Sequence, residues 1–598
     1  MARKDKRRRK KTAGPPRRGA PRRMDAKTAM RAAIALHQAG KPAEAAKIYT
    51  QVLAAQPDHA DALHLLGVAH HQGGEHERAV ELIGKAMALG PPNARYLSNL
   101  GEAYKALGQH AEAAESYRQA LAVDPALAGV HYNLGNVLAE LDMADEAIAS
   151  YGRALALDAD DAEVHNNLGN VLLAEERLEE AAASYRRAVD LKPDYANAHG
   201  NLGSALRDMG RLDDAAASCR RALEIDPGMA EAHCNLGIAL KEMGRRQEGA
   251  ACFRRALEIR PHFAEAHYMH ARAHHFAPGE EGIARIAEAL AAKGVTDDER
   301  SYLLFALGKA HDDIGLYDQA FAYYGQANEA MARRADYDAA AHGEMIDAIE
   351  KVFSQAPEPV TGATDGDADG AAKVPVFVIG MSRTGKTLVE SLLTRHDAVH
   401  GAGESLELEG ALRRVVDENS IPWIYPQCVR FLSAEQINEV GMSYMERISR
   451  DAPRARLLVN TLPANYQYLG LILQALPAAR IIFCQRHPFD TCLYVYFSRY
   501  RHGNRHSYEL PALGAYYADF HRLMAHWTGL FGERILRVRY EALVEDPGQV
   551  AARAYRFCGL ADDAAAPLAE FTDSEVGHWR HYESHLDDLR RGFAAPIG

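Results

Sequence analysis

Residues 380–387 have the residue types and the spacing of a phosphate-binding loop. Their sequence, Gly-Met-Ser-Arg-Thr-Gly-Lys-Thr, matches the pattern Gly-x-x-x-x-Gly-Lys-Ser/Thr at every defined position. In that pattern backbone N–H groups surround phosphate oxygens, Lys386 reaches the β- and γ-phosphates, and the Thr387 hydroxyl binds Mg²⁺. The segment therefore predicts phosphate binding and, by this motif alone, a nucleoside triphosphatase.

The residues on either side of this loop have the patterns of a strand and a helix. Pro375–Ile379 is a short β-branched and aromatic run typical of a buried parallel strand, and residues 388–394 are amphipathic. A strand, a glycine loop and a helix N-terminus together direct N–H groups at a phosphate. Strand-like runs at 480–484 and 534–539 predict an α/β domain with a mostly parallel sheet. Neither run ends in the aspartate that holds Mg²⁺ in triphosphatases, which argues against that reading.

Further motifs over residues 374–598 resemble those of the sulfotransferases. They are the segments 378–390, 400–404, 462–470, 479–493, 539–547 and 557–560. The likeness is greatest to the bacterial tetratricopeptide-repeat sulfotransferases and more distant to the tyrosylprotein sulfotransferases. It implies a P-loop-like domain that transfers a sulfuryl group from 3′-phosphoadenosine 5′-phosphosulfate (PAPS) to an acceptor hydroxyl, with basic side chains in place of a metal.

The resemblance also assigns roles to individual residues. The 5′-phosphosulfate would be held by the loop residues Arg383, Thr384, Gly385, Lys386 and Thr387. Arg486 would pair with the 3′-phosphate, which suits a guanidinium fork, and Tyr494 stands where the family has a serine ligand of that phosphate. Glu404 occupies the position of the general base, so Glu404 and Lys386 are the expected catalytic residues. The alternatives are a surface turn for Glu404 and an ion pair with Asp490 for Arg486.

The sequence departs from the family pattern at four places. The family loop Gly-x-Pro-Arg-Ser-Gly-Thr-Thr differs here at Ser382, Thr384 and Lys386, and Asn460-Thr461 replaces Asp-Lys. A lysine expected at the bridging oxygen is therefore missing, although Lys386 could supply its charge.

The other two departures lie at the expected nucleotide-binding side. Tyr494 replaces the serine, although its hydroxyl could still donate to a phosphate. The stretch between Phe571 and Val576, which closes over the nucleotide in the family, is short. The alternative to an active enzyme is a relative that has lost catalysis and acts as an interaction protein.

The first half of the chain repeats every 34 residues. Leu-Gly recurs at Gly67, Gly101, Gly135, Gly169, Gly203 and Gly237, and in most units a proline follows 24 residues later. This period and these positions resemble the tetratricopeptide repeat, which implies antiparallel helix pairs in a right-handed superhelix. We expect repeats over 25–297, further repeat-like helices over 298–353, a Pro/Gly/Ala/Asp-rich linker over 354–373 and the transferase domain over 374–598.

A ladder of asparagines accompanies five consecutive repeats. Each stands two residues before the glycine: Asn99, Asn133, Asn167, Asn201 and Asn235. In the repeat family this position faces the concave groove, and the ladder resembles that of the O-linked N-acetylglucosamine transferase, where it holds an extended peptide. We therefore expect a protein or peptide acceptor, with a glycan or small molecule as the alternative. The opposing interpretation is that Asn-Leu-Gly is only a common consensus choice.

Composition and charge limit the remaining classes. The 598 residues are 47% hydrophobic, which is globular composition, and the net charge is −12. Residues 1–23 contain twelve Lys or Arg and one Asp, so residues 1–24 are expected to be a disordered basic tail, or sequence upstream of a true start at Met24. The acidic remainder argues against a nucleic-acid-binding body, although the tail could bind nucleic acid.

Cysteine and histidine usage indicates neither disulfides nor a metal. The seven cysteines contain no Cys-x-x-Cys pair, and the histidine groups lack a convincing set of carboxylate or thiolate partners. No apolar run reaches the length of a membrane span and no secretory signal is visible, so we expect a cytoplasmic protein.

Overall fold

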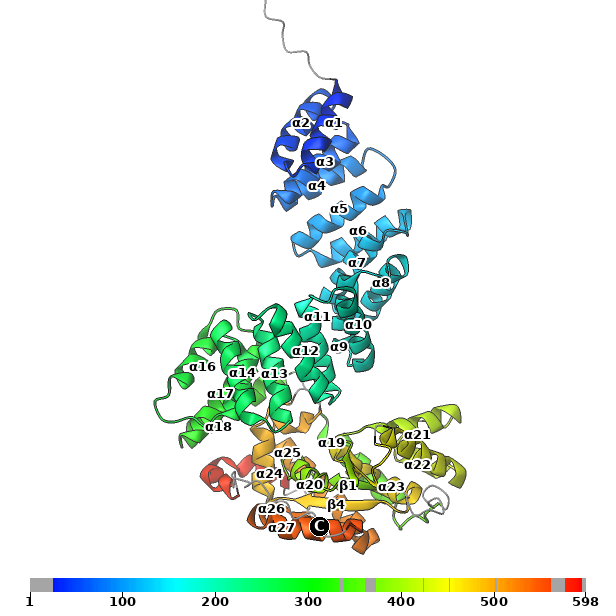
Figure 1. Ribbon diagram of the computed structural model, residues 1–598, viewed down its shortest axis with the longest axis vertical. Helices are drawn as coiled ribbons and strands as arrows, with labels where there is room; N and C mark the ends of the chain where they lie inside the picture. Colours follow the sequence, from blue (N-terminus) through cyan, green and yellow to red (C-terminus); the bar gives the residue numbers. More distant parts are fainter. Residues whose placement is uncertain are drawn as a thin grey trace, which may run out of the picture. The chain divides into compact units, whose positions relative to one another are not determined.

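The structure is a computed structural model that describes residues 25–333, 337–360, 373–422, 424–450, 452–500, 503–560 and 576–593. Its contacts divide the chain into two compact units, which meet in sequence at Pro227 and Gly228 (Figure 1). The basic tail, most of the expected linker and the short stretch before Val576 lie outside the described residues.

The first unit consists of antiparallel helix pairs, one pair for each 34-residue repeat. Its helices are α1 (Ala26–Gln38), α2 (Pro42–Ala55), α3 (Ala60–Gln72), α4 (His76–Met87), α5 (Ala94–Ala106), α6 (His110–Val123), α7 (Ala128–Glu140), α8 (Ala144–Leu157), α9 (Ala162–Ala174), α10 (Leu178–Leu191), α11 (Ala196–Asp208) and α12 (Leu212–Ile225). The repeat pattern of the sequence is therefore confirmed as helical hairpins.

The repeated glycines allow the two helices of a pair to approach closely. A Cβ placed on Gly135 in α7 would lie 2.6 Å from the ring of Tyr151 in α8, which is buried. Ordinary carbon contacts are about 3.5–4.0 Å, so only glycine fits against this ring.

The second unit begins with helices that continue the repeat pattern. They are α13 (Ala230–Glu242), α14 (Arg246–Ile259), α15 (Ala264–Ala273), α16 (Glu281–Ala291), α17 (Asp297–Asp313), α18 (Tyr317–Ala332) and α19 (Ala339–Val352). In the pair α17 and α18, Gly308 backs onto the ring of Tyr324 as the glycines of the first unit back onto theirs. These two helices therefore pack as a repeat, although they are out of phase with the 34-residue period.

An α/β domain completes the second unit. Its strands β1 (Val374–Ile379), β2 (Val399–Gly401), β3 (Leu457–Asn460), β4 (Arg480–Gln485) and β5 (Ile535–Arg539) form a parallel sheet in the order β2-β3-β1-β4-β5. Its helices are α20 (Lys386–Leu393), α21 (Glu407–Glu418), α22 (Ala434–Ser449), α23 (Leu469–Ala475), α24 (Pro488–Tyr496), α25 (Leu510–Phe531), α26 (Tyr540–Glu545), α27 (Pro547–Cys558) and α28 (Asp587–Phe593). Short 3₁₀ helices are η1 (Gln427–Phe431), η2 (Pro463–Tyr468), η3 (Arg505–Tyr508), η4 (Gly532–Arg534) and η5 (His578–His585).

Both faces of the sheet are covered, because side chains of a strand point alternately to its two sides. Phe377 and Ile379 of β1 join a core with residues of α21–α25, whereas Val376 and Val378 join a second core with residues of α20 and α27. The first of these cores also contains residues of α15 and α17, so the last repeat helices and this face of the sheet share one hydrophobic core.

Polar contacts also join the repeat-like helices to the α/β domain. Arg499 follows α24; its guanidinium contacts Asp298 at 2.6 Å and its Nε donates to Ser301 at 2.9 Å. The buried Asn328 of α18 donates to the carbonyl oxygen of Tyr496 at 2.8 Å. At the start of the expected linker, the N–H of Val360 donates to the carbonyl oxygen of Gln474 at 3.0 Å, so this part of it is held against the domain.

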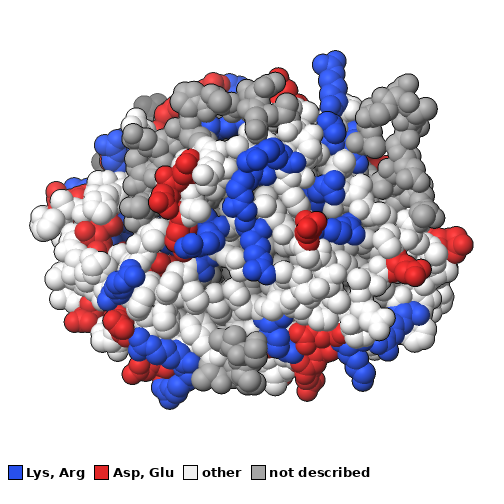
Figure 2. All heavy atoms as spheres, turned by 90° about the horizontal axis from the view of Figure 1, so that it is seen from below, with Lys and Arg blue, Asp and Glu red and all other residues white. Residues whose placement is uncertain are grey.

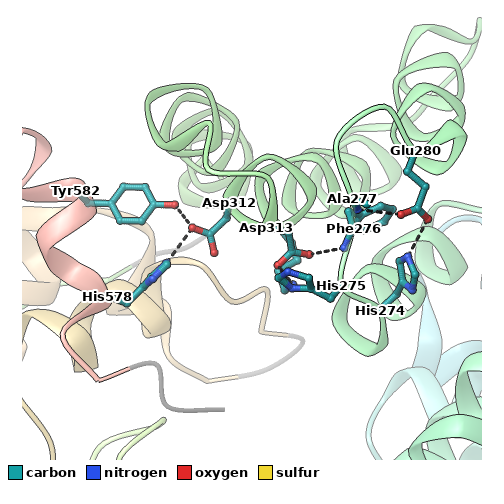
Figure 3. A network of polar contacts seen from close by, with 10 residues as sticks. His274, His275, Phe276, Ala277, Glu280, Asp312, Asp313, His578 and Tyr582 are labelled. Atoms are coloured by element: carbon teal, nitrogen blue, oxygen red, sulfur yellow. Dashed lines mark hydrogen bonds and ion pairs between the residues drawn. The ribbon is translucent and has the colours of Figure 1, made fainter. Parts of the chain in front are cut away.

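The segment that contains η5 is bound to α17 by a half-buried carboxylate (Figure 3). Asp312 accepts hydrogen bonds from the hydroxyl of Tyr582 and from Nε2 of His578, the latter at 2.9 Å. Tyr582 is fully buried and His585 pairs with Asp318 at 2.8 Å. The third histidine of η5, His581, stacks on the ring of Tyr317 at 4.3 Å, so all three contact α17 or α18. Among the described residues, no group of three His, Cys, Asp or Glu is arranged to hold a metal, and no helix has the length and apolarity to cross a membrane.

Candidate active site

The carboxyl end of β1 lies at the point where the strand order reverses. From β1 the chain goes to β2 and β3 on one side of it and then returns to β4 and β5 on the other. Open parallel sheets bind ligands in the crevice at such a point, outside the carboxyl ends of the strands. The segments that meet there are the loop after β1, Thr461 after β3, Arg486 after β4 and Tyr540 after β5.

The loop after β1 is tight and has strained backbone. A Cβ on Gly380 would lie 2.7 Å from the carbonyl oxygen of Cys484, and Gly385 has φ of 91° at the start of α20. Arg383 also has a positive φ, 69°, which is uncommon for a side chain with a Cβ. The Thr384 hydroxyl donates to the carbonyl oxygen of Met381 at 2.7 Å and so closes the turn. The expected strand, glycine loop and helix are therefore present.

Lys386 and Glu404 are brought together beside this loop. Lys386 opens α20, its side chain is 7% exposed, and its Nζ lies 4.0 Å from Oε1 of Glu404. Burial lowers the pKa of the Lys386 ammonium from its ordinary value, and the charge of Arg383 acts in the same direction, whereas Glu404 opposes it. The Glu404 side chain is 61% exposed, so it stands at the rim of the site.

A half-buried carboxylate of α20 shapes the turn that presents Glu404. Oε1 of Glu390 accepts a hydrogen bond from the N–H of Gly403 at 3.1 Å, and a Cβ on Gly401 would lie 2.7 Å from the same oxygen. Burial raises the pKa of Glu390, and the hydrogen bond from Gly403 partly offsets that effect. Glu390 is a positioning residue that sequence reasoning did not identify.

Asn460 and Thr461, which replace the expected Asp-Lys, hold the other side of this turn. Nδ2 of Asn460 donates to the carbonyl oxygen of Ser405 at 3.0 Å, and the N–H of Thr461 donates to the carbonyl oxygen of Gly403 at 2.8 Å. Both side chains are buried. Residues 403–405 are therefore fixed by β3 on one side and by Glu390 on the other.

Arg486 is held between two aromatic rings. Its guanidinium lies 4.3 Å from the ring centroid of Tyr494 and 4.3 Å from that of Tyr540, and its NH1 donates to the carbonyl oxygen of Arg383 at 3.2 Å. Tyr494 thus contributes its ring face to the arginine. The carboxylate of Asp490 accepts the N–H groups of Gly577 and Trp579 at 2.8 and 2.9 Å.

Two cavities adjoin Arg486. The first, here named the junction cavity, has a volume of about 190 Å³ and combines residues of the α/β domain with residues of the repeat-like helices. Its charged and hydrogen-bonding members are Tyr268, Arg272, Lys309, Asp312, Tyr324, Arg383, Arg486, Tyr494 and Ser498. The second cavity, of about 450 Å³, lies between the end of β4, α25 and residues 576–580 and contains no residue of the phosphate loop.

The asparagine ladder links successive repeats of the first unit. Asn167 donates to Oδ1 of Asn136 at 2.9 Å, and the Tyr151 hydroxyl donates to the same oxygen at 2.7 Å. One repeat further on, Asn201 donates through Nδ2 to Asn166 and Asn170, each at 3.0 Å. Asn99 contacts His64, Asn133 donates to Glu102, and Asn235 lies in α13 of the second unit. These amides are half-buried and, in the first unit, connect neighbouring repeats.

Three residues near the loop were not singled out by the sequence. Ser498 accepts a hydrogen bond from Arg383 at 2.8 Å, Tyr540 packs on Arg486, and Arg272 comes from a repeat helix. Tyr540 lies in the Arg-Tyr-Glu motif at the end of β5, which was the one available indication.

Comparison with protein families assigns both parts of the chain. Residues 375–564 match the model of the sulfotransferase family, and residues 36–101, 101–142, 144–175, 166–230 and 206–273 match models of the tetratricopeptide repeat. The chain therefore carries a sulfotransferase-family domain behind tetratricopeptide repeats.

Individual relatives match part of the chain. An uncharacterized protein of Aquifex aeolicus (strain VF5) is 27% identical over 344 residues, which is 52% of this chain and 44% of that protein. The solved structure of YrrB, described as a repeat protein with an unusual peptide-binding site, is 27% identical with a TM-score of 0.29 and covers 32% of this chain and 98% of its own. The structure of PilF from Pseudomonas aeruginosa is 22% identical with a TM-score of 0.32, and the match covers 35% of this chain and 94% of the PilF chain.

Proposed function

We propose that this chain, with its sulfotransferase-family domain behind tetratricopeptide repeats, transfers a sulfuryl group from PAPS to an acceptor hydroxyl, and that the repeats recruit a protein or peptide acceptor. The observation that supports it best is the pairing of Lys386 and Glu404, 4.0 Å apart, beside a glycine loop at the reversal of strand order. A cation for the leaving phosphate and a carboxylate for the acceptor proton are the two groups that this reaction needs.

The residues present fit the phosphosulfate group. Gly380 and Gly385 let the backbone of the loop approach a ligand closely, and the N-terminus of α20 directs its N–H groups at the same place. Lys386 and Arg383 supply positive charge. The charge of Arg383 in addition to that of Lys386 matters for binding the phosphosulfate, because the lysine expected at the position of Thr461 is absent.

In the proposed step the oxygen of the acceptor hydroxyl forms a bond to sulfur while the bond from sulfur to the bridging oxygen of the 5′-phosphate breaks. The hydroxyl proton passes to the carboxylate of Glu404. The negative charge that develops on the departing 3′-phosphoadenosine 5′-phosphate (PAP) is met by Lys386 and Arg383. Glu390 and Asn460 hold the backbone of residues 403–405 and so orient Glu404.

The strand ends favour this reaction over nucleotide hydrolysis. Strands β3, β4 and β5 end in Asn460, Gln485 and Arg539, so none of these strands ends in a carboxylate that could hold Mg²⁺.

Nucleotide binding by the full chain tests the proposal. We expect PAP to bind with micromolar affinity in calorimetry and Mg²⁺–ATP to bind more weakly. Tight binding of Mg²⁺–ATP without PAP would support a triphosphatase instead, and binding of neither would support an interaction protein.

Variants then separate binding from chemistry. With radiolabelled PAPS and a peptide library as acceptor, Glu404→Gln should bind PAP like the parent chain and transfer sulfuryl about a hundredfold more slowly. Lys386→Met should lose about a hundredfold or more in transfer. Glu418→Gln, an exposed glutamate at the end of α21, is the matched control. Parental transfer rates in both site variants would refute the assigned roles.

A further inference from the structure

The junction cavity is surrounded by cations from two different folds. Arg383 and Arg486 come from the transferase domain, whereas Arg272 and Lys309 come from the repeat-like helices α15 and α17. Lys309 is paired with Asp313 at 2.5 Å, and Asp312 is occupied by Tyr582 and His578. Within the described part of the chain, no ion pair with a carboxylate is formed by Arg272 or Arg383.

A fifth cation adds to the positive potential at this place. Lys241 near the end of α13 is affected electrostatically by Arg272 and Arg383, and burial together with these charges lowers its pKa to about 7. Like charges gathered in a half-buried position destabilise one another unless an anion binds between them. On the face of the molecule in Figure 2, by contrast, basic and acidic side chains are interspersed.

The larger cavity beside Arg486 has a smaller excess of positive charge, since three arginines and two carboxylates line it, against four cations and one carboxylate in the junction cavity. Its two carboxylates are used within the protein, because Asp490 accepts two backbone N–H groups and Glu541 accepts the N–H of His487 at 2.9 Å and lies 3.6 Å from Arg539. The phosphate loop contributes no residue to it. The junction cavity is therefore the better site for a second phosphate close to the loop.

Arg272 packs on a tyrosine of its own helix α15, and that tyrosine contacts the transferase domain. Its guanidinium lies 5.5 Å from the ring centroid of Tyr268, and the hydroxyl of that tyrosine accepts the N–H of Arg499 at 3.1 Å. On the opposite wall, Ser498 accepts a hydrogen bond from Arg383 and donates to the carbonyl oxygen of Tyr494 at 2.7 Å, which orients Arg383.

We propose that Arg272, from a repeat helix, is a further ligand of the 3′-phosphate of the nucleotide, which it would bind in the junction cavity together with Arg486. The proposal rests on the proposed function, since PAPS and PAP carry this phosphate. It makes the last repeats part of the nucleotide site, so that the transferase domain is complete only together with them.

The test compares PAP with AMP, which lacks the 3′-phosphate, by calorimetry on the full chain. Arg272→Met should weaken PAP binding about tenfold to a hundredfold, as expected for one charge-assisted contact to a phosphate, and should leave AMP binding unchanged. Arg272→Lys keeps the charge without the fork and should lose less; it also provides a second variant if the methionine variant folds poorly. Arg254→Met, at an exposed arginine of α14, is the control.

Each outcome has a definite meaning. If the parent chain binds no PAP, the proposed function fails, and this inference with it. If the parent binds PAP and the ratio of PAP to AMP affinity is the same in the Arg272 variants, the proposed function stands and the role of Arg272 is refuted. An equal loss for both nucleotides also refutes it, because the effect would then not depend on the 3′-phosphate.

Discussion

Two glycine-to-alanine substitutions in neighbouring helices should change the stability of the first unit in opposite directions. Gly169 in α9 backs onto the buried ring of Tyr185, where a Cβ would lie 2.6, 2.8 and 2.9 Å from three ring carbons. Around Gly152 in α8, a Cβ would have no atom within 4 Å. The chemical change is the same, so the difference between the variants isolates the packing.

The magnitudes follow from these distances. At position 169 the ring has to move by about 1 Å in a close-packed interior, which costs about 2–3 kcal/mol. Replacing a glycine in a helix by alanine stabilises the helix by about 1 kcal/mol, so Gly169→Ala should destabilise the first unit by about 1–2 kcal/mol in total. Gly152→Ala has the favourable helix-propensity effect without the steric cost and should stabilise the first unit by about 0.5–1 kcal/mol.

Urea unfolding with two probes measures this difference. Circular dichroism reports the helices of both units, whereas the three tryptophans all lie at residue 423 or later and report the second unit alone. We expect the dichroism transition to separate the two variants by about 2–3 kcal/mol and the fluorescence transition to stay unchanged. Equal stability of the two variants would refute the argument that the repeated glycine is required by the aromatic ring.

Three further predictions concern the site, the junction and the ladder. Burial raises the pKa of the Glu390 carboxyl from its ordinary value of 4.5, so ionisation of this carboxyl favours the unfolded chain as the pH rises above that value. The stability gained by Glu390→Gln should therefore be larger at about pH 7 than at about pH 4. A gain that does not depend on pH would contradict the direction of this pKa shift. Asp312→Ala should destabilise the second unit by about 2–4 kcal/mol, because the buried Tyr582 hydroxyl loses its hydrogen-bond acceptor; unfolding followed by fluorescence measures this loss. The control is Asp318→Ala, at a side chain that is 89% exposed, which should have little effect. Asn167→Ala and Asn201→Ala should each cost about 1 kcal/mol and reduce crosslinking of a peptide substrate; unchanged crosslinking would leave the ladder a purely structural role.

The parts of the fold that follow a local pattern could be predicted from the sequence. The run at 375–379 corresponds to β1, the run at 480–484 to β4 and the run at 534–539 to β5, each within one residue at either end. These strands were recognisable because a buried parallel strand is a continuous apolar run. Strands β2 and β3 have only three and four residues, too few for any period to show.

The contacts around the site depend on residues far apart in the chain. Glu404 and Lys386 are only 18 positions apart and were identified by motif, but the exposure of Glu404 follows from how the turn at 403–405 is held. Ser498 lies 115 residues from the Arg383 that it binds, and Arg272 belongs to an element whose pattern indicates only helix packing. Such pairings are set by tertiary packing, which local patterns do not encode.

The bond between Asp312 and Tyr582 has a consequence for synthesis on the ribosome. The two residues are 270 positions apart, and Tyr582 fills a fully buried place beside α17 and α18. At about 5–20 residues per second, the ribosome needs on the order of tens of seconds to supply the second partner after the first. During that time the apolar surface that Tyr582 covers on α18 stays open, although the first unit has all the residues that it needs to fold. We therefore expect the second unit, and not the first, to require chaperone protection while the chain is being made.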